Sequence, residues 1–177
     1  MINAEEYGRA LFLLSEEVGT ADTVIAEIDE VSALIGENDG YARLLDTPAL
    51  PKEERLRLID EAFSAFDTHL VNTIKILCES RSVRLYDKLA RAYHAAYDDA
   101  RGIIRAEAVS AQPMTSEQIT AMTKKLESMT KKRVILSNRV DPDILGGVRL
   151  SYSGIQIDGS LKTRLEGFKD SLRSLVL

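Results

Sequence analysis

Apolar residues recur every three or four positions through roughly the first hundred residues, which is the spacing of amphipathic helices. Gly19 separates the first two predicted helices, and Pro48 ends a short third one. A fourth helix begins after Pro51, and Ser82 is expected to cap the last helix of the series. The apolar positions that define the six helices are Tyr7, Leu11, Leu14 and Val18; Ile25, Ile28, Val31 and Ile35; Tyr41, Leu44 and Leu45; Ile59, Ala62, Phe63 and Phe66; Leu70, Ile74, Leu77 and Cys78; and Tyr86, Leu89, Tyr93, Tyr97 and Ala100.

After Gly102 the pattern changes to a mixture of strands and helices. The predicted elements are, in order, an extended segment at 104–111, a helix capped by Thr115 or Ser116, a strand at 134–140, a hairpin of 148–152 and 155–157, and a final helix capped by Asp158-Gly159-Ser160. Short links between helices favour antiparallel packing. The sequence therefore predicts a mostly α protein. Residues 1–105 form an N-terminal six-helix antiparallel bundle, and residues 106–177 form a small α+β C-terminal domain.

The charge differs between the two predicted domains. The whole chain carries a net charge of -5, with 45% hydrophobic residues, which is ordinary for a globular protein. Residues 1–105 hold 20 acidic and 12 basic side chains, whereas residues 106–177 hold 8 acidic and 11 basic ones. This asymmetry indicates two modules that face different partners.

The chain shows no signal for a membrane or a secretory route. It has no run of the roughly 18 to 20 apolar residues that cross a bilayer, and its first residues match neither a signal nor a transit peptide. Cys78 is the only cysteine, so an intramolecular disulfide is excluded and a reducing compartment is expected. Any membrane association is expected to be indirect, through a partner.

The titratable residues form no recognisable catalytic or metal site. His69 and His94 lie on different predicted helices without ligands at metal spacing, although His94 and Asp98 share a helix face. Cys78 lies on an apolar face with no base at hand, as a buried free thiol commonly does. No catalytic, cofactor-binding or metal-binding residue is therefore predicted, and the chain is not expected to be an enzyme.

Gly146-Gly147 and a basic run are the other two candidates for ligand chemistry. The glycines precede a strand and not a helix, so they suit a turn or bulge better than a phosphate-binding loop. The basic run, from Lys124 to Arg133, lacks interleaved aromatic residues and belongs to an acidic protein. No nucleic acid is expected as a partner.

The closing third of the chain carries a pattern of shape-setting residues. Its blocks are Asp141-Pro142-Asp143-Ile144-Leu145-Gly146-Gly147-Val148, Ile157-Asp158-Gly159-Ser160-Leu161 and Arg164-Leu165. This pattern resembles the carboxy-terminal signature of the ATP synthase delta subunit family, which includes the mitochondrial oligomycin-sensitivity-conferring protein. The resemblance extends in order over essentially the whole chain, from Tyr7-Gly8-Arg9-Ala10-Leu11-Phe12 onward. One departure is Gly8, which stands where the family usually has alanine.

The resemblance implies a stator subunit of the F-type proton-translocating ATP synthase. Such a subunit joins the catalytic alpha/beta head to the b subunits of the peripheral stalk and resists rotor torque. It implies that the helical domain grips the amino-terminal helix of an alpha subunit and that the C-terminal domain meets the b subunit. It also implies a position at the cytoplasmic face of the membrane; the chain's opening residues favour a bacterium. By analogy with the family, the candidate partner-binding residues are Tyr7, Leu11, Leu14, Leu70, Ile74 and Leu77.

Two other functions remain open from the sequence. One is a helical-bundle adaptor for an unrelated protein partner, because an amphipathic helix can bind a groove in any such bundle. The other is an RNA-binding accessory protein that uses the basic run, for which strong salt dependence would be diagnostic.

Overall fold

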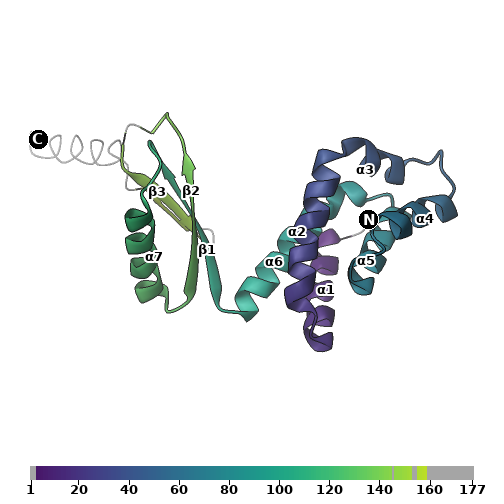
Figure 1. The fold of residues 1–177 in the computed structure, drawn as a ribbon, viewed down its shortest axis with the longest axis horizontal. Helices are drawn as coiled ribbons and strands as arrows, with labels where there is room; N and C mark the ends of the chain where they lie inside the picture. Colours follow the sequence, from purple (N-terminus) through teal and green to yellow (C-terminus); the bar gives the residue numbers. More distant parts are fainter. Residues whose placement is uncertain (1–2, 145, 153–154, 159–177) are drawn as a thin grey trace, which may run out of the picture. The chain divides into compact units, whose positions relative to one another are not determined.

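The structure, a computed structural model, describes residues 3–144, 146–152 and 155–158. The chain divides into two units, Met1–Tyr97 and Asp98–Leu177. The first is helical, and the second contains a four-stranded sheet within its described residues (Figure 1). The predicted fold class, a mostly α bundle followed by a small α+β domain, is confirmed.

The helical unit follows the apolar spacing of the sequence closely. Its elements are α1 (Ala4–Val18), α2 (Ala21–Glu37), α3 (Asp39–Asp46), α4 (Lys52–Ala62), α5 (Thr68–Glu79), the 3-10 turn η1 (Val83–Leu85) and α6 (Tyr86–Ala100). Gly19 adopts a left-handed conformation (φ +80°) and ends α1, as the sequence predicts. Two alanines placed on buried faces by the spacing, Ala62 and Ala100, are exposed because each is the last residue of its helix.

Long side chains from five helices build the core of this unit. The largest fully buried ones are Tyr86, Tyr93, Phe63, Ile28, Leu45, Ile59, Leu70, Ile74, Leu77 and Leu89. The tyrosine hydroxyls find partners inside the core: that of Tyr93 lies 2.7 Å from Ser15 Oγ, and that of Tyr86 donates to the Ile28 carbonyl at 3.4 Å. The rings therefore fill the core without leaving a buried polar atom unpaired.

Ser82 does not cap the last helix through its side chain, contrary to the prediction. A turn of 3-10 helix, η1, precedes α6, and Ser82 Oγ donates to the Ser80 carbonyl. The backbone N–H of Val83 donates to Asp46 Oδ1 at 2.9 Å instead. The carboxylate of a residue 37 positions earlier supplies the cap, and its negative charge suits a helix N-terminus better than a hydroxyl.

A buried arginine joins the ends of two helices. Arg55 of α4 is only 4% exposed, and its Nη1 donates to the carbonyl oxygens of Leu45 at 2.9 Å and Cys78 at 2.8 Å. These carbonyls belong to the last turns of α3 and α5, where the helix dipole is negative. The guanidinium thereby satisfies backbone acceptors that the core hides from water.

Arg55→Met should destabilise the helical unit strongly, because it leaves the Leu45 and Cys78 carbonyls buried without this donor. The expected loss in the free energy of unfolding is about 2–4 kcal/mol, measured by urea denaturation followed by circular dichroism. Arg57→Met, on the same helix but exposed, serves as the control and should change the free energy by less than about 0.5 kcal/mol. Equal effects of the two substitutions would contradict this role of Arg55.

Helices α1 and α6 approach each other closely at Gly8. A Cβ added to this glycine would lie 2.3 Å from the backbone oxygen of Leu89 and 3.0 Å from the Cβ of Ala92. Gly8 is therefore matched to the helix packed against it.

Gly8→Ala should lower the free energy of unfolding by about 1–3 kcal/mol, since the clash involves backbone that can move only with its helix. Gly36→Ala is the matched control. Its added Cβ meets no atom within 4 Å, so the better helix propensity of alanine should raise stability by about 0.5–1 kcal/mol. Thermal and urea unfolding of both variants measure the difference, and a stabilised Gly8→Ala variant would refute the close packing.

The second unit consists of a sheet with one helix on it. Its elements are β1 (Ile103–Ser110), α7 (Ser116–Thr130), β2 (Arg133–Val140), β3 (Val148–Tyr152) and β4 (Ile155–Asp158). The strand order is β2-β1-β3-β4, with β1 and β2 parallel and the other two pairs antiparallel. Helix α7 connects the parallel pair, as such a pair requires. Thr115, one of the two predicted caps, begins α7 in a capping box with Gln118.

The boundary between the units differs from the predicted one. Gly102 (φ +61°) follows α6, and β1 begins directly after it at Ile103. Residues 103–105, which the predicted domain boundary includes in the bundle, are therefore part of the sheet. The division of the chain falls earlier still, after Tyr97.

Candidate partner-binding surfaces

The six predicted partner-binding residues do not share one environment. Leu11, Leu70, Ile74 and Leu77 lie in the core of the helical unit, where they are at most 3% exposed. Tyr7 is half-buried against this core, and Leu14 is 39% exposed. Four of the six thus stabilise the bundle, because the helical period that selected them identifies the buried face of a helix.

Other apolar residues on α1 and α5 are exposed and were missed. Leu13 and Val18 of α1 are 66% and 54% exposed, and Ile76 of α5 is 39% exposed. Helices α1 and α5 pack against each other, so these side chains belong to neighbouring elements. Leu13 and Ile76 fall outside the apolar period of their helices, and that mismatch was the available signal. We call Tyr7, Leu13, Leu14, Val18 and Ile76 the α1/α5 surface.

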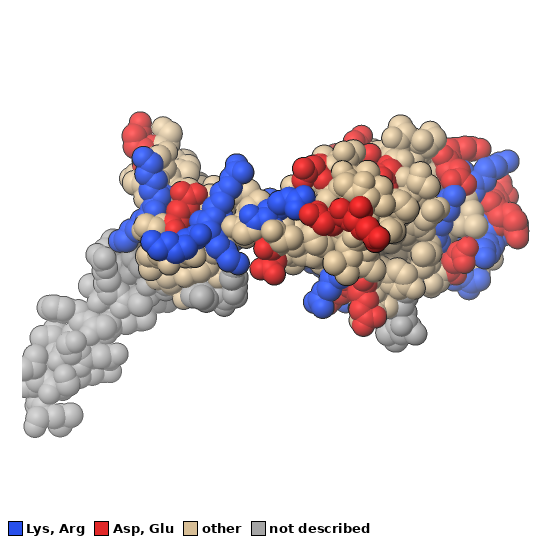
Figure 2. Space-filling view, turned by 90° about the horizontal axis from the view of Figure 1, so that it is seen from below, with Lys and Arg blue, Asp and Glu red and all other residues tan. Residues whose placement is uncertain are grey.

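Acidic side chains dominate around the α1/α5 surface. Glu5, Glu6 and Glu17 of α1 are exposed, and residues 1–97 carry 18 acidic and 10 basic side chains. Figure 2 shows red acidic side chains spread over this unit among blue basic ones, whereas blue side chains predominate on the visible face of the sheet unit. Exposed apolar residues within an acidic surround suit a partner whose apolar face is flanked by basic residues.

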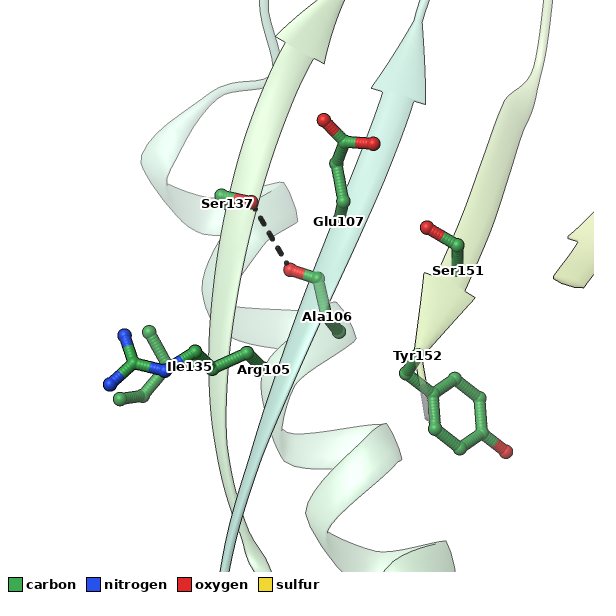
Figure 3. A pocket seen from close by; sticks show the side chains of 7 residues that line it. All are labelled: Arg105, Ala106, Glu107, Ile135, Ser137, Ser151 and Tyr152. Carbon is green, nitrogen blue, oxygen red and sulfur yellow. Dashed lines mark hydrogen bonds between the residues drawn. The ribbon is translucent and has the colours of Figure 1, made fainter. Parts of the chain in front are cut away.

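The sheet unit presents a second candidate surface on the face turned away from α7. Alternation along β1 buries Ala106 and Ala108 against α7 and turns Arg105 and Glu107 to the opposite face. There, Glu107 lies between Ser137 of β2 and Ser151 of β3 (Figure 3). These side chains line a hollow of about 350 Å³, which the small serines leave open.

Cys78 and His94, to which the sequence assigned no catalytic or metal-binding role, lie in structural surroundings. Cys78 is fully buried, and burial raises the pKa of its thiol, which donates to the Leu45 carbonyl at 3.5 Å. A protonated, enclosed thiol is unreactive. His94 pairs with Asp29 of α2 at 2.8 Å, and not with Asp98 as its helix face allowed. Among the described residues, no three His, Cys, Asp or Glu side chains come together as metal ligands.

The glycine turn predicted before the hairpin has the expected backbone. Gly146 and Gly147 have φ values of +138° and +86°, a region that disfavours side chains, and β3 begins at the next residue. Asp158 is the last residue of β4. The remainder of the predicted cap, Gly159-Ser160, lies outside the described residues.

Gly147→Val should destabilise the sheet unit by about 1–3 kcal/mol, because a β-branched residue at φ +86° is strained. Gly147→Asn is the matched control and should cost less, since asparagine tolerates this region. Hydrogen exchange of β1 and β3 amides reports the local stability. Equal protection in both variants would show that the positive φ is not required.

Comparison with known proteins supplies the family. A sequence model described as ATP synthase delta (OSCP) subunit matches residues 4–172. The ATP synthase subunit delta of Agrobacterium fabrum is 34% identical over 97% of this chain and 93% of the relative. That of a Geobacillus species is 34% identical over 97% of both chains. A chain in the mitochondrial ATP synthase hexamer of Toxoplasma gondii has the same fold. Its TM-score is 0.74 at 19% identity, over 97% of this chain and 98% of that one.

These comparisons define a structural, non-catalytic subunit of a membrane-associated complex. The chain belongs to the ATP synthase delta (OSCP) subunit family, as the resemblance in its closing third predicts. It is a stator component of the ATP synthase, peripheral to the membrane complex. No helix in the described part of the chain is long and apolar enough to span a bilayer.

Proposed function

We propose that this chain links the catalytic alpha/beta head of an F-type ATP synthase to the b subunits of the peripheral stalk. By holding the head against rotor torque, it keeps proton flow coupled to ATP synthesis at the cytoplasmic face of a bacterial cell membrane. The observation that carries the proposal is the family match, which extends from residue 4 to residue 172 and so includes both units.

The physical task explains why a non-catalytic protein is needed. A rotor that turns inside the head drags the head with it unless a fixed link opposes the torque. Such a link needs two attachment surfaces and no chemistry of its own. The two units of this chain, with residues 1–105 acidic and residues 106–177 basic in balance, provide two chemically different surfaces.

The helical unit binds the amino-terminal helix of an alpha subunit through the α1/α5 surface. An amphipathic helix that lies along two packed helices buries its apolar face against their exposed apolar residues. Leu13, Leu14 and Val18 offer that contact on α1, and Ile76 offers it on α5. Four buried side chains in the core fix the positions of α1 and α5: Leu11, Leu70, Ile74 and Leu77.

Leu14→Glu combined with Ile76→Glu should weaken binding of the alpha subunit's amino-terminal segment at least about ten-fold, since it places carboxylates in an apolar contact. Titration calorimetry with the full-length chain measures this. In assembled complexes, ATP hydrolysis should persist while proton pumping is lost.

Leu34→Glu, on α2, is the matched control, because Leu34 has the same 39% exposure as Leu14. It should leave both binding and pumping unchanged. Coupled pumping in complexes that lack this chain altogether would overturn the proposed function. Unchanged binding by the double variant would overturn only the placement of the alpha-subunit contact.

A further inference from the structure

Helix α7 covers only one half of the sheet face on which it packs. The N–H groups of Arg133 and Asp141 donate to carbonyl oxygens at the two ends of β1, so the alternate N–H groups of β2 point away from β1. One of these, the N–H of Val134, donates to Glu127 Oε1 of α7 at 3.1 Å. Glu127 therefore reaches the outer edge of β2, and α7 lies over β2 and β1.

A hollow of about 750 Å³ opens on the other side of α7. Gln118, which lines this hollow, precedes Glu127 by nine residues, which is about two and a half turns, and so lies on the opposite side of the helix. The walls are formed by α7 and by the start of β3: Gln118, Ala121, Met122 and Lys125, with Gly147 and Val148. The hollow therefore lies between α7 and the β3 side of the sheet.

Apolar side chains on the β3 and β4 half of this face have no described helix over them. Leu150 pairs with Ala108 of β1 and with Ile157 of β4, so all three point to the face that carries α7. Ile157 is nevertheless 44% exposed. Met129, seven residues after Met122 and so on the same side of α7, is 63% exposed. Among the described residues, this half of the face is apolar and open.

The sheet is wide enough for two helices on this face. Neighbouring strands lie about 4.8 Å apart, so the middle of the β3–β4 pair lies about 10 Å from the middle of the β2–β1 pair. Packed helices have axes about 8–10 Å apart. A second helix beside α7 would therefore lie over β3 and β4, fill the hollow and cover Ile157 and Met129.

The chain itself supplies a segment at this place. Strand β3 is antiparallel to both β1 and β4, so β4 runs in the direction of β1 and ends at the end of the sheet where α7 begins. Its last residue, Asp158, pairs with Arg149, which is next to Val148 in the wall of the hollow. Residues 159–177 follow and lie outside the described part of the chain. Apolar residues recur in them at helical spacing: Leu161, Leu165, Phe168 and Leu172.

We propose that residues 161–172 form a helix that docks in this hollow, parallel to α7, with its apolar side on Val148, Leu150 and Ile157. This helix is about 18 Å long, whereas α7, with 15 residues, is about 22 Å long, so it fits along α7. The last segment of the chain thus completes the core of the sheet unit. The contact lies within one chain and is therefore independent of the proposed partners.

The first test measures the exposure of α7 in the full-length chain. Leu165→Glu combined with Phe168→Glu places two carboxylates on the apolar side of the segment, so oxidation of Met129 by hydrogen peroxide should become at least about three-fold faster. Thr163→Glu combined with Ser174→Glu is the matched control. It adds the same two carboxylates to the opposite side of the helix and should change the rate less than about 1.5-fold. Mass spectrometry measures both rates.

A cross-linking measurement separates loss of docking from loss of folding, because it leaves the apolar residues in place. Since β-α-β connections are right-handed and the docked helix runs parallel to α7, the Lys169 side of this helix faces α7 and the Ser171 side faces away. Lys125→Cys with Lys169→Cys should therefore be linked within one chain by a short bifunctional maleimide at least about ten-fold faster than Lys125→Cys with Ser171→Cys. The native thiol, Cys78, is buried.

Three outcomes would overturn the proposal. Equal linking rates for the two cysteine pairs would show that the segment does not lie beside α7. Linkage between two chains, in place of linkage within one, would assign the open half of the face to a second copy. If the unaltered chain and the Leu165→Glu, Phe168→Glu variant oxidise at Met129 equally fast, the segment does not cover α7. Protection of Met129 that then appears only on addition of the soluble segment of the b subunits would assign this half of the face to the stalk.

Discussion

The helical unit is organised around one buried cation. Arg55 reaches the last turns of α3 and α5 at once, and the adjacent Asp46 holds the first turn of η1. Positive charge thus meets helix ends of negative polarity, and negative charge meets a helix end of positive polarity. Because α5 is held here at its C-terminus, the position of its exposed Ile76 beside α1 follows from this node. The proposed α1/α5 surface thus depends in part on polar contacts at the end of α5.

The long helix α6 completes the unit with aromatic rings whose hydroxyl groups are hydrogen-bonded. Phe12 meets Tyr93 edge to face at 5.7 Å, and the Tyr93 hydroxyl also donates to the Ala21 carbonyl at 3.2 Å. Burial raises the pKa of Tyr86 and of Tyr93, so both hydroxyls remain protonated donors throughout the physiological range. The two hydroxyls therefore join α6 to α1 and α2 by hydrogen bonds. Because hydrogen bonds are directional, they fix the orientation of α6, which apolar packing alone does not.

The elements of this fold were accessible from sequence, whereas its contacts between distant residues were not. The apolar spacing predicts α1 to α6, and the capping residue Thr115 predicts the start of α7, because both signals involve residues close together in the sequence. The Asp46 cap and the Gly8 contact join residues far apart in the chain, so no local pattern encodes them. The same limit applied to the partner surface. Periodicity ranked Leu70 with Leu14, although one is enclosed and the other exposed. Ser137 and Ser151 gained meaning only when pairing with β1 placed them in one row.

The position of β1 between two strands has a mechanical consequence for the proposed load-bearing role. This strand follows Gly102 directly and pairs with β2 along one edge and with β3 along the other. Tension that enters through Gly102 acts along the strand axis, whereas the hydrogen bonds to its neighbours run across it. Extraction of β1 must therefore break both ladders together, in shear, and cannot open them one bond at a time. The point where the chain enters the sheet therefore resists tension. A strand at the edge of the sheet in the same position would have one ladder of hydrogen bonds, and tension could break these bonds one after another.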